Sequence, residues 1–305
     1  MDVDREFQMA GLQNLVFRKA FWRFIFFFIL VNFLPINNDV SSAGLFSDYK
    51  NAHSAFNERR YSEALEICNR VLSQAALPSS VRSKILAGRG LVYERLGQWN
   101  SAMKDYNQAA QLSPNLCWAY IGYGNVLMAL SEYKEAISEF NRALSIERQN
   151  TTAIYRRGNC HFLSNNLYDA SDDYSKVLRI NPQHRYAKIM FYLTGLRSGK
   201  NFSTEHVDDH TELESDWPNP ILAFYSGQLK PDDLLLKAVD KNIVKEREKK
   251  SEAYFHIGQY YVISGDYEKA KQAFTSCVNQ NINYYMEYRG AQAELIHLTG
   301  LNNQQ

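Results

Sequence analysis

A short segment recurs three times at a fixed spacing between residues 97 and 170. It reads Gly97-Gln-Trp-Asn-Ser-Ala102, then Ser131-Glu-Tyr-Lys-Glu-Ala136, and then Asn165-Asn-Leu-Tyr-Asp-Ala170. The three alanines are 34 residues apart, and an aromatic residue follows each alanine by four positions. Registered small and large side chains at this period are typical of a solenoid built from repeated helix pairs.

A glycine occupies one register of the segment before each copy, at Gly90, Gly124 and Gly158. Glycine inside a helix costs ~1 kcal/mol relative to alanine, so its recurrence needs a packing reason. We predict that each glycine lets the first helix of a pair approach the second helix closely. Large side chains at helical spacing are expected to fill the remaining space: Tyr93, Leu127, Tyr106, Phe140 and Tyr174.

The same register returns near the carboxyl end as Gly265-Asp-Tyr-Glu-Lys-Ala270, with Gly258 before it and Phe274 after it. An earlier copy begins at Arg60-Tyr-Ser-Glu-Ala64. The pattern resembles the tetratricopeptide (TPR) repeat, whose unit is two antiparallel helices. The resemblance implies an all-α, right-handed TPR superhelix of antiparallel helix pairs, with a degenerate middle and a C-terminal capping helix.

Five parts are expected along the chain. A signal peptide or signal anchor covers 1–43, and an N-terminal repeat array covers 44–198. An acidic irregular segment follows over 199–216. Residues 217–298 are expected to hold a short helix pair, one repeat and the capping helix, and 299–305 form a tail.

The leader has the order of parts found in a secretory signal. Basic residues between 18 and 23 precede the apolar stretch Phe24–Leu34, and small residues follow up to Ala43. This stretch of eleven residues is shorter than the ~20 that a membrane helix needs. We therefore predict export to the bacterial periplasm with cleavage near Ala43. An uncleaved inner-membrane anchor is the alternative, and Met9 is an alternative start to Met1.

Charge and cysteine usage exclude several classes of protein. The 34 Lys+Arg and 33 Asp+Glu give a net charge of +1, which argues against a nucleic-acid binder with a broad basic face. The four cysteines form no Cys-x-x-Cys pair and show no metal-ligand spacing. We predict that all four are buried free thiols and that the protein has no cofactor: Cys68, Cys117, Cys160 and Cys277.

One pair of histidines has the spacing of a zinc-binding helix. His206-Val-Asp-Asp-His210 places them at i and i+4. A His-Glu-x-x-His protease would need its general-base glutamate at position 207, which is valine here. A solvated acidic loop is therefore the simpler interpretation. We predict no metal and no catalysis, with His206 and His210 as weak metal candidates only.

A solenoid of helix pairs binds its partners on the concave face, which the first helices line. Asn125 and Asn159 share one register of that face, and Gln259 takes the same place in the last repeat. Amide side chains donate to and accept from a peptide backbone, while Arg156 can pair with a carboxylate. Apolar and aromatic neighbours that add contact area complete the predicted site: Trp118, Ile121, Met128, Thr152, Tyr155 and Phe162.

This set resembles the asparagine ladder of peptide-binding tetratricopeptide proteins. Two occupants of the concave face remain open on the sequence alone. An extended peptide of a partner protein can bind there. Alternatively, the C-terminal helices of this chain or a second subunit can pack against the same side chains.

A second resemblance is more specific than the repeat. The segments Trp217–Gln228 and Phe255–Asp266, within a match over roughly 80–298, resemble bacterial NlpI-type proteins. This implies a periplasmic, homodimeric adaptor that brings a tail-specific protease together with peptidoglycan (cell-wall) hydrolases. No cysteine near residues 30–50 matches a lipoprotein anchor. The hypothesis is a non-catalytic envelope adaptor, and the alternative is a membrane-anchored assembly factor for a secretion or pilus machine.

Overall fold

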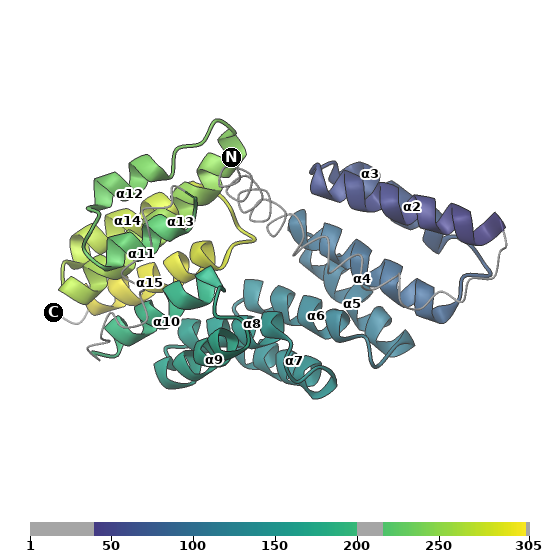
Figure 1. Ribbon diagram of the computed structural model, residues 1–305, viewed down its shortest axis with the longest axis horizontal. Coiled ribbons are helices and arrows are strands. Elements are labelled where there is room, and N and C mark those ends of the chain that lie inside the picture. Colours follow the sequence, from purple (N-terminus) through teal and green to yellow (C-terminus); the bar gives the residue numbers. More distant parts are fainter. Residues whose placement is uncertain (1–39, 200–215, 303–305) are drawn as a thin grey trace, which may run out of the picture.

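The computed structural model describes residues 40–199 and 216–302, and within these ranges every regular element is an α-helix. Antiparallel helix pairs stack along a curve, so that the first pairs of the chain face the last ones (Figure 1). The helices are α2 (Val40–Asn57), α3 (Tyr61–Leu72), α4 (Ser79–Arg95), α5 (Trp99–Leu112), α6 (Cys117–Ala129), α7 (Tyr133–Ile146), α8 (Thr151–Leu163), α9 (Leu167–Ile180), α10 (Arg185–Arg197), α11 (Asn219–Tyr225), α12 (Pro231–Lys237), α13 (Ile243–Ser264), α14 (Tyr267–Asn279) and α15 (Met286–Asn302).

The turn inside each regular pair has one conformation. Five pairs, α2/α3, α4/α5, α6/α7, α8/α9 and α13/α14, reverse the chain through a single left-handed residue with φ between 58° and 79°. Such a residue ends a helix and lets the backbone turn back on itself. The positions are Arg59, Gly97, Ser131, Asn165 and Gly265.

The registered glycines lie where the two helices of a pair meet, as the sequence predicted. A Cβ added at Gly124 would lie 2.8 Å from the Phe140 ring, and one at Gly258 would lie 2.4 Å from the Phe274 ring. No ordinary contact is that short. Gly90 and Gly158 bear the same relation to Tyr106 and Tyr174.

The four cysteines are buried and free, which confirms the prediction from their spacing. Burial raises the pKa of the Cys68, Cys117 and Cys277 thiols to about 12. Buried thiols with raised pKa values are poor nucleophiles and poor metal ligands. They therefore act as small core residues.

Two equivalent ion pairs are separated by two repeat periods, and neither pair was predicted from the sequence. Arg89 holds Asp105 at 2.7 Å, and Arg157 holds Asp173 at 2.6 Å. Both aspartates are almost fully buried. The repeat between them has Glu139 at the aspartate position. Each pair ties the first helix of a repeat to the second.

The C-terminal half begins with a short helix pair and ends with one long helix. The short pair α11 and α12 follows Trp217, and α15 closes the stack. The capping helix α15 extends to Asn302, four residues beyond the expected end at residue 298. The helix α2 begins at Val40, so the proposed cleavage position at Ala43 falls within it.

Several predictions concern residues outside the described ranges. The leader up to residue 39 is among them, and so are His206 and His210. None of the helices in 40–199 and 216–302 is long and apolar enough to cross a membrane. The same residues contain no group of three or more His, Cys, Asp or Glu side chains arranged to hold a metal ion.

Candidate protein-binding groove

A cleft of about 1370 Å³ runs along the inner side of the curved stack, and we call it the inner groove. The helices α2, α4, α6 and α8 form one wall of it. Helix α13 and the connection from α14 to α15 contribute the other wall. The first helices of the repeats therefore line the cleft, as expected for a concave binding face.

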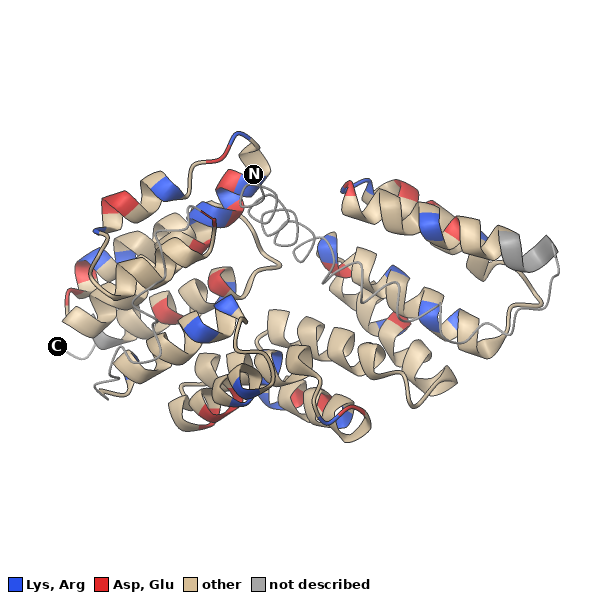
Figure 2. Ribbon diagram, viewed as in Figure 1, with Lys and Arg blue, Asp and Glu red and all other residues tan. Residues whose placement is uncertain are grey.

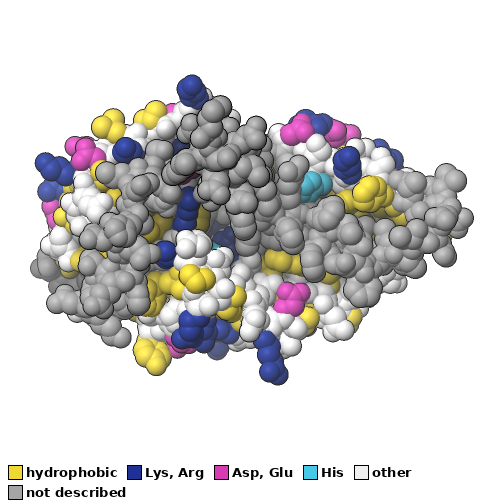
Figure 3. Space-filling model, in the orientation of Figure 1, with side chains coloured by type: hydrophobic (Ala, Val, Ile, Leu, Met, Phe, Trp, Pro, Cys, Tyr) yellow, Lys and Arg dark blue, Asp and Glu magenta, His cyan; other side chains and the backbone are white. Residues whose placement is uncertain are grey.

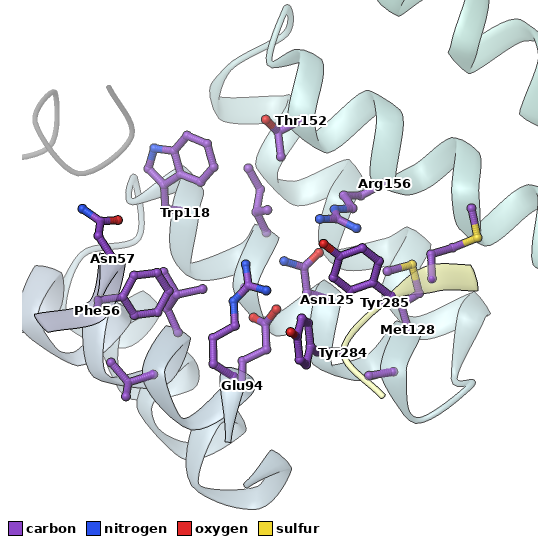
Figure 4. Close-up of a pocket in the computed structure, with 18 of the residues that line it drawn as sticks. Phe56, Asn57, Glu94, Trp118, Asn125, Met128, Thr152, Arg156, Tyr284 and Tyr285 are labelled. Carbon is purple, nitrogen blue, oxygen red and sulfur yellow. The ribbon is translucent and has the colours of Figure 1, made fainter. Parts of the chain in front are cut away.

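Most of the predicted site residues meet in this groove. Figure 4 shows side chains from α6 and α8, among them Trp118, Asn125, Thr152 and Arg156, directed into the cleft. They lie on two adjacent first helices, so the 34-residue register places them side by side. The predicted residues that line the groove are Trp118, Ile121, Asn125, Met128, Thr152, Tyr155, Arg156 and Asn159.

The structure places two predicted residues elsewhere, which corrects the expectation for both. Phe162 is 6% exposed and belongs to the hydrophobic core. Gln259 has no exposed surface: its Oε1 accepts from Arg197 at 2.5 Å, and its Nε2 donates to Glu294 at 3.0 Å. Because α15 packs on α13, the ladder register of the last repeat is covered by the chain's own helix.

The two ladder asparagines carry polar atoms without a partner among the described residues. Asn125 Oδ1 and Asn159 Nδ2 are buried and make no hydrogen bond. Asn159 Oδ1 accepts from the Tyr174 hydroxyl at 2.9 Å, which fixes the orientation of this amide. An unpaired buried amide atom costs roughly 1–3 kcal/mol. The two atoms belong to residues that line the groove in adjacent repeats, one as an acceptor and the other as a donor.

Partly and fully buried charges also line the groove. Glu94 accepts from the Tyr106 hydroxyl at 3.2 Å, and burial raises the pKa of its carboxyl against the opposing influence of Arg95 and Arg156. Burial also raises the pKa of Glu287, again opposed in part by Arg156. Arg156 thus lies within electrostatic reach of carboxyl groups on both walls, which limits the cost of burying it.

Sequence reasoning missed Glu94 and the part of the groove that α4 lines. The repeat period could have revealed it, because four positions line the cleft that lie 34 residues before Trp118, Ile121, Asn125 and Met128. These positions are Lys84, Ala87, Leu91 and Glu94. The C-terminal contributors, such as Tyr284 and Glu287, had no repeat signal and could not be found this way.

The groove is electrically balanced. Seven Lys or Arg and seven Asp or Glu residues line it. In the view of Figure 2, charges of both signs are interspersed over the described helices. On the face in Figure 3, the visible side chains of the described residues form small mixed areas rather than one broad apolar or basic patch. A nucleic-acid strand would need a basic track that these residues do not form.

Comparison with known proteins identifies the repeats. Among solved structures, the first TPR of Spaghetti (RPAP3) bound to the HSP90 peptide SRMEEVD is 23% identical over 39% of this chain and 94% of its own, with a TM-score of 0.38. MamA 41-end from Desulfovibrio magneticus RS-1 is 17% identical over 57% of this chain and 97% of its own, with a TM-score of 0.48. Family models of the tetratricopeptide repeat match residues 83–116, 119–150 and 251–281, so the chain contains tetratricopeptide repeats at α4/α5, α6/α7 and α13/α14.

Proposed function

We propose that this protein is a non-catalytic adaptor that holds an extended segment of a partner protein in its inner groove. Tetratricopeptide repeats are scaffolds for protein interactions, and the matching family models describe such repeats. One observation carries the proposal. Asn125 Oδ1 and Asn159 Nδ2, an acceptor and a donor in the same register of adjacent repeats, lie buried and unpaired at the groove.

An extended polypeptide is the ligand that this arrangement suits best. Its backbone presents N–H donors and C=O acceptors in alternation, so it can satisfy both asparagines without a particular sequence. The half-buried Trp118 adds aromatic contact area at low entropic cost. The balanced charge of the lining favours a segment of low net charge over a strongly acidic or basic one.

The finer proposal concerns compartment and partners. The resemblance of roughly 80–298 to NlpI-type adaptors supports an exported homodimer that links a tail-specific protease to peptidoglycan hydrolases. The apolar stretch Phe24–Leu34 supports export. Purification from the native envelope with such a protease would support this assignment. Purification with a multi-subunit secretion or pilus complex would support the assembly factor instead.

Site-specific photo-crosslinking tests groove binding directly. A benzoylphenylalanine replaces Trp118 in the full chain in its native host, and a matched probe replaces Tyr168, which is 79% exposed on α9. We expect a partner crosslinked from position 118 and not from 168. Mass spectrometry of the adduct identifies the partner segment, which is then synthesised.

The purified segment is next titrated against variants of the full chain. Asn125→Ala removes one or two hydrogen bonds, so affinity should fall about tenfold. Tyr168→Ala should bind like the wild type, and circular dichroism checks that both variants remain folded. Equal affinity of the wild type and Asn125→Ala would overturn the proposal.

A further inference from the structure

The connection between α14 and α15, residues 280–285, enters the inner groove, and we call it the groove loop. Asn283, Tyr284 and Tyr285 of this loop line the cleft together with the ladder residues. Figure 4 shows Tyr284 and Tyr285 directed toward Glu94 and Asn125 on the opposite wall. The last repeat of the chain therefore occupies part of the surface that the first repeats offer to a partner.

Tyr284 makes the principal contact between the two ends of the stack. Its hydroxyl donates to Glu248 Oε1 at 2.8 Å and accepts from Arg59 Nη1 at 3.4 Å. Arg59 also holds Glu248 through Nη2 at 2.7 Å. The Arg95 guanidinium lies 5.1 Å from the centre of the Tyr284 ring. These residues come from the α2–α3 turn, α4 and α13, which are far apart in sequence.

Two further contacts near this closure are also polar. The Arg289 guanidinium lies 5.9 Å from the Trp99 ring, and the Asn283 amide lies beside Gly97. Successive repeats, by contrast, join through continuous hydrophobic clusters such as the one around Phe140. The Arg59 side chain is 42% exposed, and ion pairs at that exposure are weak and screened by salt. Salt therefore weakens the Arg59–Glu248 ion pair more than it weakens the apolar contacts between successive repeats.

We infer that the groove loop is an autoinhibitory occupant of the inner groove, held in place by the Arg59–Glu248–Tyr284 contact. A partner segment reaches Asn125 only after the loop swings away with the end of the stack. The inference rests on the proposed function, because it concerns regulation of the same groove. It also makes predictions about the isolated protein that need no partner.

Opening is measured first, by pulsed electron paramagnetic resonance on the full chain. Spin labels are attached at Ser62→Cys and Lys241→Cys, two exposed positions on either side of the closure, while the native cysteines are buried. Arg59→Ala should lengthen and broaden the distance distribution, and so should a rise in salt with Arg59 intact. An unchanged distribution in Arg59→Ala overturns the inference.

Occupancy is measured second, with a fluorescein-labelled synthetic peptide of the sequence Gln280–Glu287. Tyr284→Ala combined with Tyr285→Ala should vacate the groove and bind this peptide at least tenfold more tightly than the wild type. Adding Asn125→Ala to that variant should remove the gain. Exposed tyrosines outside the groove provide the matched control, Tyr168→Ala with Tyr267→Ala, which should bind like the wild type.

Equal peptide binding by the wild type and the vacated variant overturns the inference. Arg59→Ala with Glu248→Gln provides a second opened protein in case the tyrosine variant fails to fold, and it should also bind the peptide more tightly. Failure of the proposed function can be distinguished from failure of this inference. A missing partner at position 118 leaves the distance and peptide results unaffected, whereas failed opening leaves the crosslinking result unaffected.

Discussion

Replacing Gly258 by alanine tests the packing explanation for the repeated glycines. A Cβ there would lie 2.4 Å from Cε1 of Phe274, a ring with no exposed surface, whereas ordinary contact begins at 3.4 Å. Helix α14 or the ring must therefore move by about 1 Å, and overpacking of this kind costs roughly 1–3 kcal/mol. The higher helix propensity of alanine offsets ~1 kcal/mol of this cost. We expect the free energy of unfolding to fall by about 1 kcal/mol.

Urea unfolding followed by circular dichroism measures this change. Gly300→Ala is the matched control, because no atom lies within 4 Å of the added Cβ, and it should be neutral or slightly stabilising. In Gly258→Ala with Phe274→Leu, the smaller side chain relieves the contact. The loss in the double variant should therefore be smaller than the sum of the single losses by about 1 kcal/mol. A Gly258→Ala protein as stable as the wild type would refute the reasoning.

Three further predictions follow from buried groups. Arg157→Leu removes the arginine partner of the buried Asp173 carboxylate, while Lys176 Nζ remains 3.6 Å away, and should cost about 3 kcal/mol in urea unfolding. A loss below about 1 kcal/mol would contradict this expectation. Burial lowers the pKa of His256 from 6.5 to about 3, so the unfolded chain binds more protons between these values and stability falls as the pH falls. Unfolding at pH 5 should need about 2 kcal/mol less than at pH 7, and His256→Asn should flatten this dependence. Burial raises the pKa of Cys277 to about 12, and the other three cysteines are also buried. A thiol reagent should therefore label the native protein slowly and the urea-unfolded protein fully at all four cysteines.

The register of the ladder was predictable because a solenoid repeats its geometry with its sequence. Asn125 and Asn159 lie at the groove since 34 residues advance the chain by one helix pair. The same rule fails at Gln259. Its helix position is equivalent, but its neighbour is α15 instead of open groove, so its amide bonds to Glu294. The sequence period predicts the direction in which a side chain points. It does not predict which helix or open space lies opposite that side chain.

The amino-acid sequence alone determined the helix pairs and their internal packing. Glycines such as Gly124, alanines such as Ala136 and the rings that face them are local in sequence, so their spacing encodes their contacts. The closure of the stack depends on tertiary structure. Arg59 meets Glu248 at a sequence separation of 189 residues because curvature accumulates over successive repeats, and no local sequence pattern predicts the total curvature. The same curvature places the groove loop, with Tyr284, in the inner groove that the first helices of the repeats line.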